Sequence, residues 1–417
     1  MIAKLASLPL VDPVSLADGP AVVERVTTLR RSADYDLIIL GGGCAGLSLA
    51  MRLASLGVKC PRTLVIEKRP EYTNDRTWCF WGKGSPQVNH LVSHAWQRVT
   101  LRSESRSVEV DCGATPYQMI PGQAFYVHAL QAIEASQRID LLKGVSLLSE
   151  PRNSGHEWHL ETSEGSYSGA AVIDTRPSHS SGLQNVLLWQ SFCGSEIECE
   201  SPVFDPTTVE LMDFSKTHKS RIHFTYLLPL SRTRALVETT AFALVPLTAQ
   251  DLSSDLSSAI ASRVQGRRFR SLRSESGILP MGTSLARNSP HPTFIRAGLT
   301  AGAARPSTGY AFQRIQRWAD SCVQLIADGK PPISHKPDPL VLRGLDHLFV
   351  SVLRSRPELG PELFLSLFEK TDTERLIRFL SDQGTIADYA AIASVLPVFP
   401  FIREIPKAVL RKAAAQS

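Results

Sequence analysis

The stretch DLIILGGGCAGLSLAMRLASLG, residues 36–57, decides the fold class. It opens with a short apolar run that three glycines stop, which is typical of a buried parallel strand. Small and apolar residues then recur at helical spacing over residues 44–56, and Gly57 is a typical helix stop. A second apolar run at residues 63–66 predicts another buried strand. Together these segments predict a right-handed β-α-β unit, and therefore an α/β protein.

The glycines between the first strand and the helix satisfy the pattern G-x-G-x-x-G over Gly41–Gly46. The first glycine permits a tight turn, the second lets the backbone approach a pyrophosphate, and the third lets the helix pack on the strand. Glu67 ends the second strand 21 residues after Gly46, where a carboxylate can bind a ribose hydroxyl. This unit alone leaves open whether the dinucleotide is FAD or NAD. The residues predicted to contact it are Gly41, Gly43, Cys44, Ala45, Gly46 and Glu67.

The composition is that of an ordinary globular protein. Of the 417 residues, 43% are hydrophobic and 20% are charged, and the net charge is +5. Disorder, collagen and coiled coil are excluded for the whole chain, and so mild a charge gives no reason to expect nucleic-acid binding. The seven cysteines are odd in number and include no C-x-x-C pair. We therefore expect neither a disulfide scaffold nor a metal site, and a reducing cytosol fits best.

The rest of the chain divides into a strand-rich part and a helical part. Strands dominate residues 185–248, in which the runs at 222–228 and 235–241 predict a hairpin. Residues 251–272 have the pattern of a polar helix, and the proline-rich segment 330–339 precedes further helical patterns. The predicted parts are an N-terminal extension at 1–33, a dinucleotide-binding domain at 34–84, 115–180 and 273–330, an antiparallel β-sheet substrate domain at 85–114 and 185–272, and a helical region at 331–417.

A second glycine-rich stretch, RAGLTAGAARPSTGY at residues 296–310, opens onto a predicted helix. A late turn followed by a helix is where flavoproteins approach the ribityl chain and ring of FAD, and a helix N-terminus there favours negative charge on reduced flavin. The alternative is a purely structural turn. The cofactor-binding candidates in this stretch are Gly298, Gly302, Thr308 and Gly309.

Six short stretches along the chain together carry a family resemblance. They are GGGCAG at 41–46, RTWCFW at 76–81, QSFCGSE at 190–196, the segment 224–240, GILPMG at 277–282 and RPSTGY at 305–310. In this order they resemble the bacterial flavin-dependent lycopene cyclases, from about Tyr35 to about Arg403. The resemblance implies a Rossmann-type FAD-binding domain of the glutathione-reductase and hydroxylase kind, with an inserted β-rich substrate domain.

The resemblance also implies a reaction, the lycopene β-cyclase isomerisation, which has no net redox change. The terminal double bond of a ψ end group is protonated, and the internal double bond then closes a six-membered ring. Loss of a proton gives a β-ionone ring, so that lycopene becomes γ-carotene or β-carotene. FAD is required in its reduced form but is not consumed, and NAD(P)H is the expected reductant.

Protonation of an alkene requires a carboxylic acid that an apolar site keeps protonated. Glu196 matches the family's G-x-E motif, whose glutamate is thought to act as acid and base. Glu238 matches the first acid of the family's paired-acid motif, but Thr239 stands in the place of the second. We therefore favour Glu196 as the catalytic residue and keep Glu238 as the weaker candidate. The neighbouring Glu198 and Glu200 count against a catalytic role for Glu196, because a strand would place all three side chains on one solvated face.

The segment after the second strand is predicted to line the site. Arg76, Thr77 and Trp78 are placed to approach the flavin, with a structural loop as the alternative. A carbocation also needs walls that stabilise positive charge without attacking it, and aromatic faces do this. Phe80 and Trp81 continue such a cluster, although each aromatic residue is more commonly part of a core.

The physical state of lycopene bears on the helical part of the chain. A hydrocarbon dissolved in the bilayer requires an enzyme that touches the membrane without spanning it. No segment has the roughly 18 uninterrupted apolar residues of a membrane span, and the N-terminus does not resemble a secretory signal. The apolar runs at 363–368 and 395–402, the latter followed by Arg403 and Lys407, suit an anionic membrane surface. We therefore expect a cytoplasmic, peripheral membrane protein, with a helical cap on the core as the alternative for these runs.

Three other functions remain compatible with these residues. The FAD scaffold also serves monooxygenases and halogenases, which consume NAD(P)H and oxygen. A related cyclase could act on another polyene or on a terpenoid. A non-catalytic flavin-binding protein is the third alternative, against which the G-x-E and hairpin motifs argue.

Overall fold

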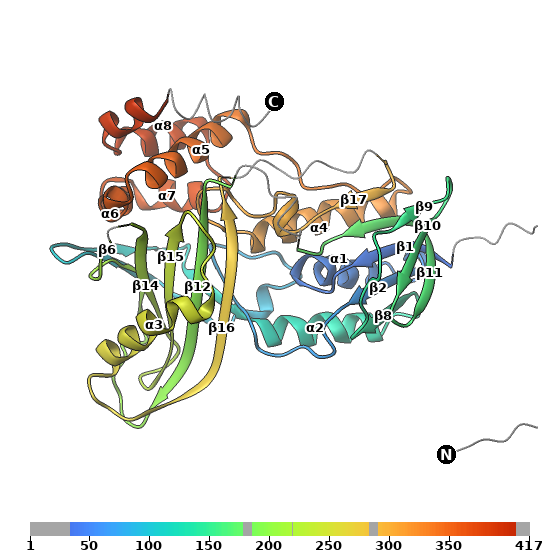
Figure 1. The fold of residues 1–417 in the computed structure, drawn as a ribbon, viewed down its shortest axis with the longest axis horizontal. Helices are drawn as coiled ribbons and strands as arrows, with labels where there is room; N and C mark the ends of the chain where they lie inside the picture. Colours follow the sequence, from blue (N-terminus) through green and yellow to red (C-terminus); the bar gives the residue numbers. More distant parts are fainter. Residues whose placement is uncertain (1–33, 178–185, 219, 283–290, 406–417) are drawn as a thin grey trace, which may run out of the picture. The chain divides into compact units, whose positions relative to one another are not determined.

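A mixed seven-stranded sheet contains the strand that precedes the first glycine turn (Figure 1). The computed structural model describes residues 34–177, 186–218, 220–282 and 291–405, so the predicted extension at 1–33 lies outside the described residues. The strand order is β8-β2-β1-β11-β10-β9, with β17 beside β11. The pair of β1 with β2 is parallel, as predicted, and β1 also pairs in parallel with β11. The strands are β1 (Tyr35–Leu40), β2 (Thr63–Glu67), β8 (Ile139–Lys143), β9 (Arg152–Asn153), β10 (Trp158–Thr162), β11 (Gly165–Asp174) and β17 (Phe294–Arg296).

The strands of this sheet are apolar on both faces, so both faces must be covered, and three helices cover one of them. Ile39 and Val65 on the strands pack in one buried cluster with Leu47, Phe125 and Ile315 on the helices. The opposite face of β1 and β2 has a smaller apolar cluster of its own. The helices are α1 (Cys44–Ala54), α2 (Gly122–Glu134) and α4 (Phe312–Ala327), and short 3-10 turns are η1 (Gly57–Lys59), η2 (Asn89–Leu91) and η4 (Leu299–Ala301).

A second seven-stranded sheet has the order β16-β12-β15-β14-β13-β5-β6 and contains the predicted hairpin, β14 and β15. The hairpin register pairs Tyr226 with Glu238. One face of the sheet is covered by α3 (Ala249–Val264), which begins with a capping box between Thr248 and Asp251. The strands are β5 (Arg98–Arg102), β6 (Ser107–Asp111), β12 (Leu188–Cys199), β13 (Thr208–Asp213), β14 (Ile222–Pro229), β15 (Arg234–Ala243) and β16 (Phe269–Met281).

The polar helix predicted over residues 251–272 ends earlier, at Val264. Gln265 and Gly266 both have positive φ, 51° and 78°, which terminates the helix in a left-handed turn. The chain then enters β16, which pairs with β12 along its whole length and runs past the domain boundary predicted at residue 272. Residues 273–281 therefore extend the antiparallel sheet.

A small sheet of β3 (Thr77–Trp81), β7 (Tyr117–Pro121) and β4 (His94–Trp96) completes the strands of the described chain. Its central strand β7 pairs with both neighbours in antiparallel fashion. Trp81 and Tyr117 lie in the same buried cluster as Phe224 and Leu236 of the large antiparallel sheet. The small sheet therefore packs on the face of the large sheet that α3 leaves uncovered.

The helices of the C-terminal part lie next to the large antiparallel sheet (Figure 1). Their apolar residues belong to the same buried cluster. Leu363, Leu365, Leu367 and Phe368 are buried there, so the expectation that the run 363–368 contacts a membrane is wrong. No single helix in the described residues is long and apolar enough to cross a membrane, although Ile386–Ser394 and Val398–Ile405, bent by 108°, pass that test as a pair. The helices are α5 (Leu340–Ser355), α6 (Gly360–Lys370), α7 (Thr373–Leu380) and α8 (Ile386–Ser394), with the 3-10 turn η5 (Pro357–Leu359) between α5 and α6.

Candidate active site

The glycine turn after β1 has the features that a pyrophosphate site requires. Gly41 has a φ of 93°, and a side chain on Gly46 would collide with the Gly41 carbonyl oxygen. Gly43 caps α1 without a side-chain hydrogen bond, so the first N–H groups of the helix have no capping partner. Among the described residues, no atom lies within 4 Å of where a Cβ of Gly43 would be. An open helix N-terminus facing free space fits a phosphate group.

Glu67 is held beside this turn, at the end of β2. Its Oε2 accepts a hydrogen bond of 2.7 Å from the Gly42 N–H, and the Arg69 guanidinium contacts its Oε1 at 3.1 Å. The Tyr72 hydroxyl donates to the Gly42 carbonyl oxygen at 3.0 Å. These bonds fix the turn. A ribose hydroxyl that binds Glu67 would therefore replace one of the hydrogen bonds that Arg69 donates to this carboxylate.

The second glycine stretch lies against the first. The Cβ position of Gly298 is 3.5 Å from the Cβ of Ala45, and its φ of 87° requires glycine. The Gly298 N–H donates to His335 Nε2 at 3.0 Å, and burial lowers the pKa of that imidazole to about 3, which keeps it neutral and able to accept. Gly302 and Gly309 also have positive φ, so this turn too is built on glycines.

The end of the second turn reaches the large antiparallel sheet. A Cβ on Gly309 would lie 2.8 Å from Oε1 of Gln190, on β12. That oxygen is buried and has no hydrogen-bond partner in the described part of the chain. The Tyr310 N–H donates to the Thr308 hydroxyl at 3.3 Å. The two glycine turns and the orphaned oxygen together fit a flavin dinucleotide that extends from the first turn toward β12.

The segment Arg76–Trp78 connects the two sheets. The Thr77 hydroxyl donates to Glu275 Oε2 at 2.7 Å and accepts from Arg273 Nη2 at 2.7 Å. Arg76 donates to a backbone carbonyl of β16. Trp78 points toward the helices instead, where its ring stacks on Phe312 at a centroid distance of 5.3 Å. Thr77 therefore belongs with the carboxylates of the large sheet, and Trp78 with the helices around the dinucleotide turn.

Glu238 lies in a row of residues that crosses four strands. The register pairs Tyr226 with Glu238, Glu238 with Gly194, and Gly194 with Glu275. Directly paired residues point to the same face of a sheet, so both carboxyl groups share the face that α3 leaves uncovered. Gly194 has no side chain to fill the space between them. Burial, followed by the charge of Glu275, raises the pKa of Glu238 to about 8, although the Thr240 hydroxyl bonds to it.

Glu196 lies on the same face of the sheet, two residues after Gly194 on β12, but its surroundings differ from those of Glu238. It is buried, and its Oε2 accepts a charge-assisted hydrogen bond of 2.6 Å from Arg273 Nε. Its Oε1 is ion-paired with Arg234. Both oxygens of Glu196 are thus occupied by guanidinium groups, which leaves neither free to carry a proton to a substrate. Glu198 continues this pattern with Arg270 at 2.6 Å, so Glu196 and Glu198 are both ion-paired with arginines.

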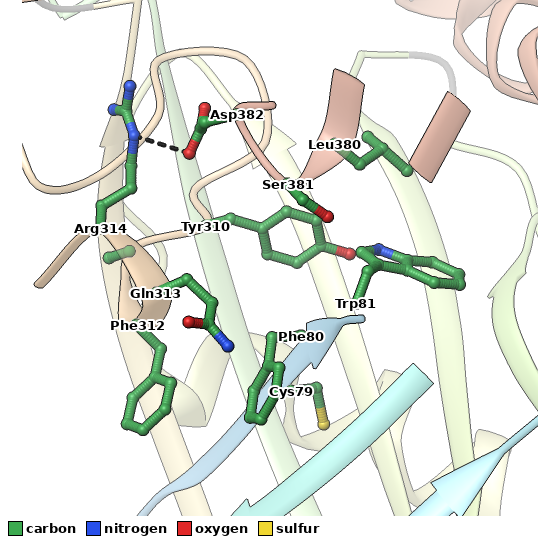
Figure 2. A pocket seen from close by; sticks show the side chains of 11 residues that line it. Cys79, Phe80, Trp81, Tyr310, Phe312, Gln313, Arg314, Leu380, Ser381 and Asp382 are labelled. Atoms are coloured by element: carbon green, nitrogen blue, oxygen red, sulfur yellow. Dashed lines mark hydrogen bonds and ion pairs between the residues drawn. The ribbon is translucent and has the colours of Figure 1, made fainter. Parts of the chain in front are cut away.

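A small pocket with several aromatic side chains lies between β3, the turn at Tyr310 and the end of α7 (Figure 2). Tyr310, Trp81 and Cys79 are among the residues that line it. Burial raises the pKa of the Cys79 thiol, and the charges of Glu275 and Glu238 raise it further, so Cys79 lies within electrostatic reach of both carboxyl groups. Burial likewise raises the pKa of Tyr310 to about 12 and that of Tyr226 well above its ordinary value. The aromatic residues and the thiol are therefore neutral, which suits a cationic hydrocarbon, although an ion pair between Arg314 and Asp382 also lines the pocket.

Comparison with known proteins identifies the family. The model of the family described as lycopene cyclase protein matches residues 36–405. The chain belongs to the lycopene cyclase family. The resemblance in the sequence motifs is therefore confirmed.

Two curated relatives of the lycopene cyclase family illustrate the match. The lycopene beta-cyclase of Paracoccus sp. (strain N81106 / MBIC 01143) is 33% identical over 304 residues, which is 69% of this chain and 72% of the relative. That of Pantoea ananas is 28% identical over 291 residues, covering 66% and 71% respectively.

Solved structures support the fold of this lycopene cyclase family member. A geranylgeranyl bacteriochlorophyll reductase-like protein from Thermoplasma acidophilum superposes with a TM-score of 0.58 at 14% identity, covering 90% of this chain and 99% of that one. A flavin-dependent brominase gives 0.58 at 13% identity, with coverage of 91% and 99%. At this identity the likeness concerns the fold alone, and it confirms the predicted flavoprotein fold class.

The sequence reasoning missed Glu275 and Arg273. Both lie in a stretch that was predicted to belong to the dinucleotide-binding domain, next to a helix predicted to reach residue 272. The signal that could have identified them is the alternation of charged and small residues in RSESG, residues 273–277, which is typical of a strand. Only the register with β12 places Glu275 opposite Gly194.

Proposed function

We propose that this chain is a lycopene β-cyclase, which isomerises the ψ ends of lycopene to β-ionone rings with reduced FAD bound. The observation that carries this proposal is a buried carboxyl group, Glu238, on an aromatic face in a member of the lycopene cyclase family. The products are γ-carotene or β-carotene. The named relatives are lycopene beta-cyclases, and the two glycine turns fit a flavin dinucleotide.

Glu238 is the acid in this proposal, in preference to Glu196. A pKa near 8 means that the carboxyl is protonated at neutral pH, as alkene protonation requires. The Thr240 hydroxyl donates to Oε1 of Glu238 at 2.9 Å, which leaves Oε2 to hold the proton. Glu196 lacks a free oxygen because Arg234 and Arg273 occupy both.

The walls of the site tolerate a carbocation. Tyr226 lies beside Glu238 in the row, and its ring meets Phe224 edge-on at 5.3 Å. The raised pKa values of the Tyr226 phenol and the Cys79 thiol keep both groups neutral, so neither is a nucleophilic anion. Aromatic faces attract positive charge without forming a bond to it.

FAD would be held by Gly41–Gly46, Glu67 and the turn 298–309, with NAD(P)H as the reductant that keeps it reduced. When bound, reduced flavin supplies an electron-rich ring that stabilises positive charge electrostatically. The chain's own residues move the proton and exclude water. Hydride transfer is not part of the isomerisation, so reductant is not consumed with product.

Gly46→Ala is expected to lower flavin binding by at least tenfold, on the order of the loss of one or two phosphate hydrogen bonds. The added Cβ would collide with the Gly41 carbonyl oxygen and lie 3.2 Å from Ile39 Cγ2, so the turn must open. The measurement is FAD bound after gel filtration, read by absorbance. Gly344→Ala is the matched control, because its Cβ position meets no described atom within 4 Å. Full flavin content in the Gly46 variant would contradict the proposed site.

The membrane-contacting surface in this proposal lies at the end of the described chain. Val398, Phe399 and Ile402 are 64%, 69% and 58% exposed, which is unusual for neighbouring large apolar side chains. The Arg403 guanidinium lies 5.0 Å from the centre of the Phe399 ring. Lys407, the other cation that the sequence places here, lies outside the described residues. An apolar surface beside a cation suits insertion into an anionic bilayer interface.

Replacing Val398, Phe399 and Ile402 by serine together is expected to lower binding to anionic vesicles by at least about tenfold, because each loses buried apolar area. Flotation with vesicles measures binding, and turnover on lycopene presented in detergent should stay unchanged. The control replaces Val58, Val127 and Leu148 by serine, three apolar residues that are also exposed but lie on the dinucleotide-binding part. Equal loss of binding in both variants would overturn this surface.

The function itself is tested by an anaerobic assay with lycopene in liposomes, FAD and dithionite or NADPH. Ringed carotenes should form only with reduced flavin and without stoichiometric loss of NADPH. Unchanged lycopene would direct the search to another polyene or a terpenoid. NADPH oxidation that tracks product on admission of oxygen would favour the monooxygenase or halogenase alternative, a fold that the brominase structure shares.

A further inference from the structure

The structure places a second carboxylate across Gly194 from Glu238. Glu238 on β15 and Glu275 on β16 both pair with Gly194, on β12 between them. Neighbouring strands are roughly 4.8 Å apart, so the two backbones stand roughly 10 Å apart over a residue without a side chain. A Cβ on Gly194 would lie 3.2 Å from the Cβ of Glu238. No side chain therefore stands between the two carboxyl groups on β12.

The two carboxyl groups have opposite surroundings. Arg273 Nη1 and the Thr77 hydroxyl both donate to Oε2 of Glu275, at 2.6 and 2.7 Å, which favours an ionised carboxylate. Within the described chain, no hydrogen bond to Oε1 of Glu275 is present, so that oxygen has lone pairs available. Glu238 has no cationic partner among the described residues and receives only the bond from Thr240. One group is thus arranged to give a proton and the other to take one.

The residue in the family's second-acid position does not fill this role. Thr239 points to the opposite face, where its hydroxyl lies 2.7 Å from His223 Nε2 beneath α3. A carboxyl at position 239 would share that orientation, because successive residues of a strand alternate between faces. Glu275 is the carboxylate that the register brings to the face of Glu238.

We propose that Glu275 is the catalytic base that removes the proton from the cyclised cation. This inference rests on the proposed function. The Glu238 O–H adds its proton to the CH carbon of the terminal double bond, which leaves the positive charge on the carbon that carries the two methyl groups. The internal double bond then supplies the electron pair of the new ring bond to that carbon. Oε1 of Glu275 then takes a proton from the ring carbon next to the cation, and the released C–H electrons form the ring double bond. The proton returns from Glu275 to Glu238 after product leaves, so the cycle neither gains nor loses protons or electrons.

The test is Glu275→Gln in the full-length protein with FAD bound, assayed on lycopene. General-base catalysis predicts a loss of turnover of about 100-fold or more. The residual product should contain rings with a shifted double bond, because the cation then loses a different proton. Glu198→Gln is the matched control, since Glu198 on β12 is also ion-paired with an arginine of β16 but lies four residues from Gly194. It should keep wild-type turnover and product.

A second measurement does not depend on turnover. The infrared band of the protonated Glu238 carboxyl is titrated without substrate, in the wild type and in Glu275→Gln, with Glu238→Gln identifying the band. Removal of the facing negative charge should shift that titration to lower pH. Thermal unfolding and flavin content report whether the Glu275 variant is intact, and Glu275→Asp, which keeps the base, should recover part of the turnover.

The outcomes separate this inference from the proposed function. Wild-type protein that leaves lycopene unchanged would overturn the function. An active wild type with near-normal turnover and unchanged rings in Glu275→Gln would overturn the role of Glu275 alone. Loss of turnover with no change in residual rings and no shift of the Glu238 band would reduce Glu275 to a structural role, which also contradicts the proposal.

Discussion

Glu238→Gln is expected to lower ring formation by about 1000-fold, within the range known for loss of a general acid, while the protein keeps its fold and its flavin. The amide has nearly the same shape and can still accept the Thr240 hydrogen bond, but it has no acidic proton. The measurement is turnover on lycopene under anaerobic conditions with reduced FAD. Flavin content and the thermal unfolding midpoint show that the variant is intact.

The pH dependence of the wild type follows from the same group. Glu238 must be protonated to act, so turnover should fall as pH rises through about 8. Folding raises this pKa from 4.5, so between pH 4.5 and 8 the folded protein binds a proton that the unfolded chain releases. Stability from this group is therefore present at low pH and lost as pH approaches 8. Glutamine does not titrate, so the Glu238→Gln variant should become progressively more stable relative to the wild type as pH rises from 4.5 to 8.

Glu196→Gln distinguishes the two acid candidates. If Glu238 is the acid, the Glu196 variant should keep more turnover than Glu238→Gln, because it disturbs ion pairs with Arg234 and Arg273 without removing the proton donor. An inactive Glu196→Gln beside an active Glu238→Gln would restore Glu196 as the catalytic acid. A Glu238→Gln enzyme with normal turnover would by itself exclude Glu238.

The local patterns sufficed to predict the elements around the dinucleotide turn. The apolar run before Gly41 and the helical spacing after it predict β1 and α1 to within two residues of their observed ends. Such predictions succeed because buried strands and glycine turns depend on neighbouring residues. The hairpin of β14 and β15 followed from alternation in the same way.

The composition of the carboxyl row could not be predicted, because it depends on register between distant strands. Glu238 and Glu275 are 37 residues apart and meet only through β12. The ion pairs of Glu196 have the same origin, since Arg273 comes from β16 and Arg234 from β15. The run 363–368 was misassigned because an apolar helix face has the same pattern whether it faces a bilayer or a core.

A buried ion pair holds the second glycine turn to the helical part. Arg305, which begins the RPSTGY motif, is fully buried and bonds Asp346 on α5 through Nε and Nη2 at 3.2 and 3.1 Å. The Ser307 hydroxyl donates to the same carboxylate at 2.7 Å. The guanidinium also lies 4.1 Å from the centre of the Phe379 ring. Since Tyr310 lines the aromatic pocket, these contacts couple the C-terminal helices to the position of the site.

Arg305→Met is therefore expected to destabilise the protein by about 3–5 kcal/mol, because it leaves the Asp346 carboxylate buried without a counter-charge. The double variant Arg305→Met with Asp346→Leu should recover much of that loss, since no unpaired charge remains. Thermal or urea unfolding measures both. Arg356→Met is the matched control: Arg356 bonds Glu358 in the same region, but the two side chains are 48% and 58% exposed, so its loss should cost about 1 kcal/mol or less. If the double variant regains stability but not flavin or turnover, the ion pair positions the turn as well as stabilising it. If Arg305→Met costs no more than the control, the buried pair is not the anchor of the turn.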